Sequence, residues 1–185
     1  MSNKKLFWQS LNSEYALDTR WLKVRKEVVK LPSGKILDDF YVVDSGELVA
    51  ILAIDNDNNV ILVKQYRHAI NNVTVDLPGG GVEIGEQLID AARRELAEET
   101  GLISGHLEKI LTYYPDSGRT ACIKHIFVAS ELTEDRDSAY SQDENENISL
   151  ILMPLKEVLA GMKSGKLKEA TLRVGVCAYL NRYEK

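Results

Sequence analysis

The sequence is poor in cysteine and has no long apolar run. Its two cysteines, Cys122 and Cys177, lie far apart and form no C-x-x-C pair, which argues against a zinc ribbon or a disulfide framework. The longest apolar run, residues 48–54, is far shorter than the ~20 residues that a membrane-spanning helix needs. No apolar stretch follows the lysines near the N-terminus, so we expect no secretory signal, no membrane partner and a cytoplasmic protein.

Positive charge is also in short supply. The 23 Lys and Arg residues against 28 Asp and Glu residues give a net charge of −5. The chain therefore lacks the basic surface that neutralises nucleic-acid phosphates, and we expect no nucleic-acid partner. The length of 185 residues suits one domain with a small appendage, and 44% hydrophobic residues are enough for a genuine core.

The first part of the chain, residues 1–46, is predicted to be a β-strand extension. Residues 21–29 and 35–43 mix apolar and charged side chains with a strand-like alternation, and Pro32-Ser33-Gly34 supplies a turn between them. We therefore expect an N-terminal β extension, residues 1–46, followed by a main domain, residues 47–185.

The main domain reads as alternating strands and helices. Aliphatic runs at 47–54 and 60–66 flank a turn-rich segment, which predicts a hairpin. A helix is predicted over 86–100, because apolar residues recur at every fourth position from Leu88 to Leu96 and Gly101 follows as a cap. Further strands are expected at 109–114, 123–129 and 148–153, a loop at 131–147, and helices at 155–163 and 167–183. The pattern predicts a layered α/β domain.

Three carboxylates gather on the predicted helix. Glu95, Glu98 and Glu99 have the spacing i, i+3 and i+4, and two of them lie at the edge of the apolar helix face. Carboxylates so placed would repel one another, and a hard divalent cation such as Mg²⁺ or Mn²⁺ would remove that repulsion. The alternative is a solvated acidic face that pairs with Arg93 and Arg94. The spacing alone leaves both readings open.

The residues before the helix favour the metal site. The run Pro78-Gly79-Gly80-Gly81 allows a tight turn and a backbone carbonyl exposed to a ligand. It is not a dinucleotide-binding fingerprint, because Ile84 occupies the place of the third glycine.

The spacing of these residues resembles a known signature. Gly80, five residues, Glu86, seven residues and then residues 94–102 resemble the Nudix hydrolase signature G-x5-E-x7-R-E-U-x-E-E-x-G-U at every fixed position. The resemblance implies a Nudix α/β/α sandwich with a mixed sheet. It also implies hydrolysis of a nucleoside diphosphate linked to another moiety, with Mg²⁺ or Mn²⁺ as cofactor.

The resemblance also implies roles for the residues of the signature. Glu95 and Glu99 resemble the principal metal ligands, Glu98 an assisting ligand and catalytic group, and the carbonyl of Gly79 a backbone ligand. In the family, Glu86 and Arg94 mainly hold the loop and the helix together.

Other segments resemble the branch that hydrolyses ADP-ribose and nucleoside diphosphate sugars: Gln65-Tyr66-Arg67, Leu77 to Gly80, Tyr114 to Gly118 and Ala170-Thr171. This branch implies a small nucleotide-sugar substrate, with ADP-ribose the leading candidate. It further implies a homodimer, in which the N-terminal strands pair with the second subunit and help to build the substrate site.

Three more site residues follow from this resemblance. Arg67 and, more weakly, Arg119 would bind the distal sugar or phosphate, where a forked guanidinium fits well. Glu144 aligns with the general base that takes the proton of the attacking water. The alternatives are an exposed strand-end cation for Arg67 and an exposed loop charge for Glu144. Many relatives carry acidic residues where this chain has Ala121 and Cys122, so a carboxylate from that place is missing.

The sequence is thus interpreted as a metal-dependent pyrophosphohydrolase that releases a nucleoside monophosphate and a sugar phosphate. Two alternatives remain: a catalytically inactive Nudix regulator that binds a ligand, and a hydrolase of RNA ends or dinucleotides.

Overall fold

A computed structural model describes residues 6–135 and 148–183 of the chain. The chain divides into two compact units. The N-terminal unit contains residues 1–46 and 114–123, and the main unit contains residues 47–113 and 124–185.

The N-terminal unit is an antiparallel ladder of three strands. Its strands are β1 (Gln9–Asp18), β2 (Lys23–Lys30) and the first part of β3 (Ile36–Ile54). β2 pairs with both neighbours, from Asp18↔Lys23 to Gln9↔Lys30 and from Lys23↔Asp44 to Lys30↔Ile36. The sequence predicted only two strands in this region, so β1 is an addition.

β3 continues without a break into the main unit. The sequence suggested two separate strands, at 35–43 and 47–54, but the structure has one strand of 19 residues. Gly46 lies inside this strand with φ +66, a left-handed backbone conformation that glycine adopts without steric cost.

The sheet of the main unit is centred on the hairpin that the sequence predicted. The second part of β3 pairs with β4 (Asn59–Arg67) through Ala53↔Ile61 and Ile54↔Val60. The Asp55 carboxylate accepts hydrogen bonds from the backbone N–H groups of Asp57 and Asn59 and so closes the turn. The other strands of this sheet are β5 (Asn72–Asp76) and β8 (Ile148–Pro154), which pair with β4, and β7 (Thr120–Glu134), which pairs with β3 and with β6 (Leu102–Tyr113).

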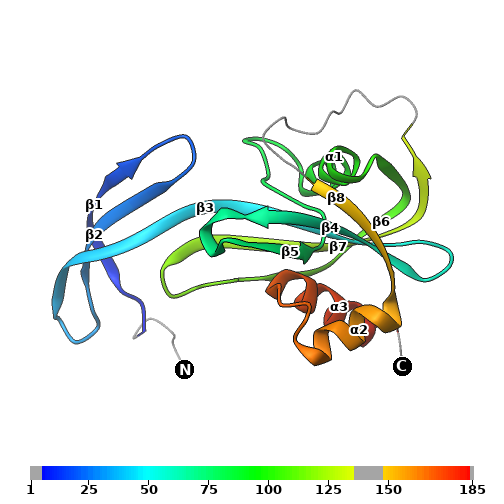
Figure 1. The fold of residues 1–185 in the computed structure, drawn as a ribbon. Coiled ribbons are helices and arrows are strands. Elements are labelled where there is room, and N and C mark those ends of the chain that lie inside the picture. Colours follow the sequence, from blue (N-terminus) through cyan, green and yellow to red (C-terminus); the bar gives the residue numbers. More distant parts are fainter. Residues whose placement is uncertain (1–5, 136–147, 184–185) are drawn as a thin grey trace. The chain divides into compact units, whose positions relative to one another are not determined.

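Helices cover both faces of this sheet (Figure 1). Helix α1 (Leu88–Thr100) packs on one face with Val49, Ile51 and Phe127. Helices α2 (Leu155–Ser164) and α3 (Ala170–Tyr183) pack on the other face with Leu52, Leu62 and Ile126. Alternate residues of β3 thus enter two different cores, which is why its apolar run is continuous. The predicted α/β/α sandwich with N-terminal β-strands is confirmed.

Several predicted boundaries were displaced. β5 was not predicted, β6 begins at Leu102 directly after α1, and β7 runs to Glu134 into the predicted loop. Across the described part of the chain, no helix combines the length and the apolar character that a membrane crossing requires.

Candidate active site

The glycine loop runs alongside β3. The N–H of Ile51 donates to the carbonyl of Pro78 at 2.8 Å, and the N–H of Val49 donates to the carbonyl of Gly80 at 2.9 Å. Gly79 has φ +152, and a Cβ atom there would lie 2.2 Å from the carbonyl oxygen of Val49. Only glycine allows the loop to approach the strand this closely.

Two carboxylates of α1 lie over this loop. The N–H of Gly79 donates to Oε2 of Glu99 at 2.6 Å. A Cβ atom on Gly80 would lie 2.5 Å from both carboxylate oxygens of Glu95. The exposed fractions of Glu95 and Glu99 are only 9% and 8%, so both are buried between the helix and the loop.

Arg94 joins the helix to the loop. Its Nε and Nη2 atoms each lie 3.0 Å from an oxygen of Glu86, and Nη2 also donates to the carbonyl of Gly81 at 2.8 Å. Its Nη1 atom reaches Glu95 at 2.7 Å and Glu98 at 3.0 Å. The hydrogen bond to Glu86 is the main cause that raises the pKa of Arg94, and the same guanidinium lowers the pKa of Glu86. Loop and helix are therefore held together by a network of charges.

Glu95, Glu98 and Glu99 could form either a metal site or a solvated acidic face, and this geometry distinguishes the two. Arg93 pairs with Asp90 at 3.1 Å on the exposed side of the helix, as a solvated face would. Arg94 does contact Glu95 and Glu98, as the alternative reading expected, but Glu95 is buried. A simple solvated acidic face does not describe this side of α1.

The residue types around the loop fit a hard divalent cation. Glu95, Glu98 and Glu99 offer carboxylate oxygens, which are the ligands that Mg²⁺ and Mn²⁺ prefer. Within residues 6–135 and 148–183, no three acidic, histidine or cysteine side chains already converge as ligands. Glu95 and Glu98 instead contact Arg94, and Glu99 contacts the N–H of Gly79.

The other predicted site residues lie in different places. Arg67 is exposed at the end of β4 in the main unit, and its charge acts on Asp76. Arg119 belongs to the N-terminal unit, where its carbonyl accepts the N–H of Val43 and its side chain helps to line a cavity of about 130 Å³. Glu144 lies outside the described residues. The structure thus brings together Gly79, Glu95, Glu98 and Glu99, and places Arg67 in the same unit.

Sequence reasoning missed a buried histidine beside the loop. His125 is 6% exposed, and its Nδ1 and Nε2 atoms lie 2.9 Å from the hydroxyl of Thr112 and 3.2 Å from Oε2 of Glu47. The carbonyl of Glu47 accepts the N–H of Val82, which joins this cluster to the end of the loop. No spacing in the sequence pointed to this contact, because its three side chains come from three separate strands.

A second missed cluster includes Asp76, directly before the loop. Burial raises the pKa of Asp76 to about 6, although the N–H of Leu77 and the charge of Lys124 oppose this. Lys124 donates to the hydroxyl of Thr171 at 2.9 Å, and the hydroxyl of Tyr113 donates to the same oxygen at 3.3 Å. The position of Asp76 two residues before Pro78 was the only sequence signal available.

Comparison with known proteins identifies this arrangement. The NUDIX domain matches residues 46–173, which include the whole loop and helix α1. The chain belongs to the Nudix family. A second match covers residues 8–43 of this Nudix hydrolase and is described as a nucleoside diphosphate sugar hydrolase N-terminal domain.

Known proteins match along nearly the whole chain. The chain is 31% identical over 173 residues to the methanol dehydrogenase activator of Bacillus methanolicus, which covers 93% of this chain and 92% of the relative. It is 31% identical over 167 residues to the ADP-ribose pyrophosphatase of Bacillus subtilis (strain 168), covering 90% and 89%. The crystal structure of an ADP compounds hydrolase superposes with a TM-score of 0.83 at 21% identity and covers 97% of both chains, which shows the shared fold.

Proposed function

We propose that this Nudix hydrolase cleaves the pyrophosphate bond of a nucleoside diphosphate sugar, ADP-ribose being the leading candidate, with Mg²⁺ or Mn²⁺. The observation that carries this proposal is the pair of buried carboxylates, Glu95 and Glu99, held over the glycine loop of a complete Nudix signature. The products are a nucleoside monophosphate and a sugar phosphate.

The substrate class is supported by the N-terminal strands and by the relatives. Residues 8–43 match a nucleoside diphosphate sugar hydrolase N-terminal domain. Relatives from Bacillus subtilis and Saccharomyces cerevisiae are named ADP-ribose pyrophosphatases, at 31% and 29% identity. A further relative is named a GDP-mannose pyrophosphatase, which is also a nucleotide-sugar activity.

The loop and α1 supply the ligands for the cation. Glu95 and Glu99 are the principal ligands and Glu98 assists them. The carbonyls of Pro78 and Gly80 accept hydrogen bonds from β3, whereas the N–H of Gly79 faces Glu99. The carbonyl of Gly79 is proposed as the backbone ligand, as the Nudix signature implies for this position. A bound divalent ion would offset the charge of the diphosphate and activate the attacking water.

The chain's other residues bind and position the substrate. Arg67 and Arg119 bind phosphate or sugar oxygens through their guanidinium groups. Glu144 accepts the proton of the attacking water as general base. If Glu95 and Glu98 bound the cation, the contacts of Arg94 with Glu86 and with the Gly81 carbonyl would still hold the loop in place.

Glu99→Gln tests the role of the carboxylates. The amide keeps the shape of the side chain and removes its charge. Turnover of ADP-ribose should therefore fall by more than ~100-fold, which is the largest loss usual for a residue that only supports a metal ligand. Glu157→Gln, on the exposed side of α2, is the matched control and should retain full turnover. Thermal unfolding of both variants checks that the fold is intact.

A panel of nucleotide sugars, dinucleotides and capped RNA tests the substrate class. The proposal expects fastest cleavage of a nucleotide sugar and complete loss of activity with EDTA. Faster cleavage of capped RNA or of a dinucleotide would show that this compound, and not a nucleotide sugar, represents the substrate class. Binding of ADP-ribose without turnover would instead indicate a Nudix regulator.

A further inference from the structure

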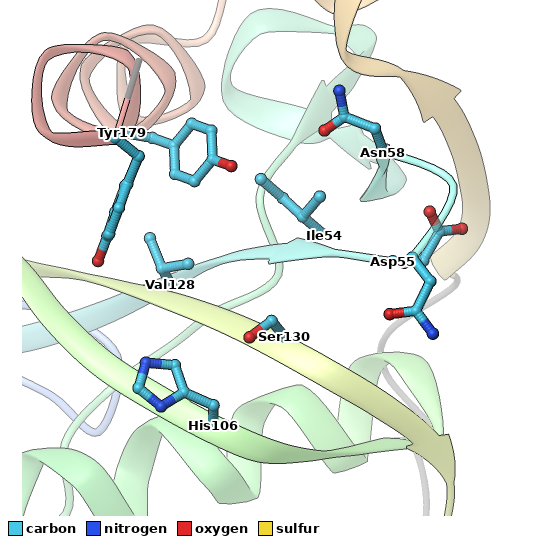
Figure 2. A pocket seen from close by; sticks show the side chains of 9 residues that line it. Ile54, Asp55, Asn58, His106, Val128, Ser130 and Tyr179 are labelled. Atoms are coloured by element: carbon cyan, nitrogen blue, oxygen red, sulfur yellow. The ribbon is translucent and has the colours of Figure 1, made fainter. Parts of the chain in front are cut away.

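The main unit has a cavity away from the glycine loop. It has a volume of about 480 Å³ and lies where the end of β3, strands β6 and β7 and the last turns of α3 meet (Figure 2). The glycine loop lies beside residues 47–51 of β3, whereas the cavity begins at Ile54. From Leu48, which bridges to Gly81, to Asp55 the strand spans seven residues, or about 23 Å. The cavity is also on the face of α3 rather than that of α1.

One side of the cavity is apolar and aromatic. Ile54 and Val128 are buried in the core that α2 and α3 cover, and they form its base. Tyr179 and Tyr183 of α3 stand beside them, with ring centroids 5.0 Å apart and ring planes inclined by 41°. Figure 2 shows Ile54 and Val128 between Tyr179 and the polar side chains beyond. Such a wall suits the flat face of an aromatic ligand.

The opposite side is polar. His106 and Ser130 are register partners of β6 and β7, so their side chains stand next to each other at the rim. The turn after β3 contributes Asp55, Asn56 and Asn58. The carboxylate accepts hydrogen bonds, and the amide, hydroxyl and imidazole groups can both donate and accept them, so together they suit an uncharged heterocycle.

The charge of the lining excludes an anionic ligand. Burial raises the pKa of Asp55, but hydrogen bonds from Asn59 and Asp57 outweigh it and bring this pKa below its usual value. Asp55 is therefore ionised at neutral pH. None of the described residues that line the cavity is a lysine or an arginine. A phosphate group would meet a carboxylate without a compensating cation.

We propose that this cavity is a second ligand site that binds a purine nucleoside without phosphate groups. The base lies against Tyr179 and Tyr183, as bases stack on aromatic side chains in nucleic-acid-binding proteins. The side-chain amide of Asn56 or Asn58 pairs with the base edge, since an asparagine amide matches the donor and acceptor of adenine. The Asp55 carboxylate accepts hydrogen bonds from the ribose hydroxyls, as acidic residues do in dinucleotide-binding folds. The volume lies within the range of about 300–1,000 Å³ that is usual for small-molecule pockets.

The test uses the full chain, adenosine and AMP, in EDTA, and follows binding by isothermal titration calorimetry. Adenosine should bind saturably. Tyr183→Ala should weaken it by about 5- to 150-fold, because stacking on one aromatic ring contributes ~1–3 kcal/mol. Ser130→Leu, which fills the cavity, should also weaken binding. Tyr183 is exposed at the end of α3, so its replacement leaves the core intact.

Two control variants separate the cavity from other causes. Tyr183→Phe loses only the hydroxyl that donates to Glu108, and Asn181→Ala changes an exposed side chain on the same turn of α3. Both should bind adenosine like the unaltered chain.

AMP should bind in the cavity at least tenfold more weakly than adenosine. Binding of AMP in the cavity is the part of its binding that is lost in Tyr183→Ala. Absence of adenosine binding, equal affinity in Tyr183→Ala, or AMP binding as tight as adenosine in this cavity would overturn the proposal. Because the measurement needs neither metal nor turnover, its failure is distinct from failure of the proposed hydrolysis.

Discussion

Gly80 and Gly81 are neighbours in the glycine loop, but their surroundings differ. A Cβ atom on Gly80 would meet the Glu95 carboxylate, whereas a Cβ atom on Gly81 would meet nothing within 4 Å. The obstacle at Gly80 is the far end of a flexible side chain and not backbone. An added methyl group should therefore displace the carboxylate without unfolding the chain.

We accordingly expect Gly80→Ala to weaken cation binding. The Mg²⁺ concentration for half-maximal turnover should rise by about 10–100-fold, the loss expected when a ligand is displaced from its support. Gly81→Ala is the matched control and should leave this concentration unchanged. Equal Mg²⁺ requirements in the two variants would show that Glu95 is not a ligand.

Asp76 makes stability depend on pH. Its pKa rises from 3.8 to about 6 on folding, so the folded chain binds this proton more tightly than the unfolded chain. Stability is therefore lost as the pH rises from about 4 to about 6, by up to about 3 kcal/mol. Asp76→Asn keeps an oxygen for the N–H of Leu77 and removes the charge.

Asp76→Asn should thus stabilise the protein above pH 6 and have little effect near pH 4. Urea unfolding at pH 4, 5, 6, 7 and 8 measures the difference in unfolding free energy. A constant difference across this range would mean that the pKa of Asp76 does not change on folding. A variant less stable at pH 8 would mean that the attraction of the nearby Lys124 charge outweighs burial.

The residues of the Nudix signature could be predicted because they are close together in the sequence. Gly80, Glu86 and Arg94 have a spacing that carries information by itself. The contacts of His125 could not be predicted, because Thr112 and Glu47 meet it only after three strands have paired. The raised pKa of Asp76 likewise depends on burial, which the residue's position in the sequence does not specify.

At the scale of elements, α1 and the loop act as one unit through Arg94. A guanidinium can contact Glu86, Glu98 and the Gly81 carbonyl at once, which the single ammonium of lysine cannot. Among the described residues, the neighbouring Arg93 side chain contacts Asp90 alone, on the exposed side of the helix. Arg93 therefore serves as a control for the contribution of Arg94 to stability.

Arg94→Lys should lower the unfolding free energy by about 1–3 kcal/mol, because the buried Glu95 and the partly buried Glu86 and Glu98 lose donors. Arg93→Lys should change it by less than about 0.5 kcal/mol, as is usual for a surface substitution. Thermal and urea unfolding measure both. Similar losses in the two variants would show that the forked contacts of Arg94 contribute little.

Elements with strong local signals were predicted well. The β3–β4 hairpin, α2 and β8 lie within a residue or two of their expected positions, because turn residues or periodicity mark them. β1 and β5 were missed. All ten residues of β1 are exposed, so its sequence has no alternation to read, and β5 has only five residues.

At the scale of the molecule, the N-terminal strands leave apolar side chains uncovered. Leu11, Tyr15 and Leu17 of β1 are 46%, 52% and 42% exposed. Clustered exposed apolar residues of this kind mark interaction surfaces. They support the proposal that the N-terminal unit pairs with a second copy of the chain.

Sedimentation equilibrium should therefore give a species of twice the 20.8 kDa chain mass. Leu11→Glu places a charge on the exposed apolar surface and should shift the equilibrium to monomer. Asn12→Glu, at the next exposed position of β1, should not. A full-length chain that is monomeric throughout would refute the homodimer.

The sequence did not predict that residues 114–123 belong to the same unit as the N-terminal strands. These residues follow β6 in the chain, and their place depends on contacts such as the Val43 N–H on the Arg119 carbonyl. The predicted boundary at residue 46 carries no information about such a distant segment.

The unbroken course of β3 has a consequence for recombining this protein with its relatives. The two family matches meet between residues 43 and 46, which is inside a strand and next to Gly46 with its left-handed backbone. A chimaera joined there must keep both the strand register and the glycine, since a shift of one residue would turn every following side chain to the wrong face. Foreign segments are better inserted at the exposed turn around Ser33, where the chain reverses without entering either core.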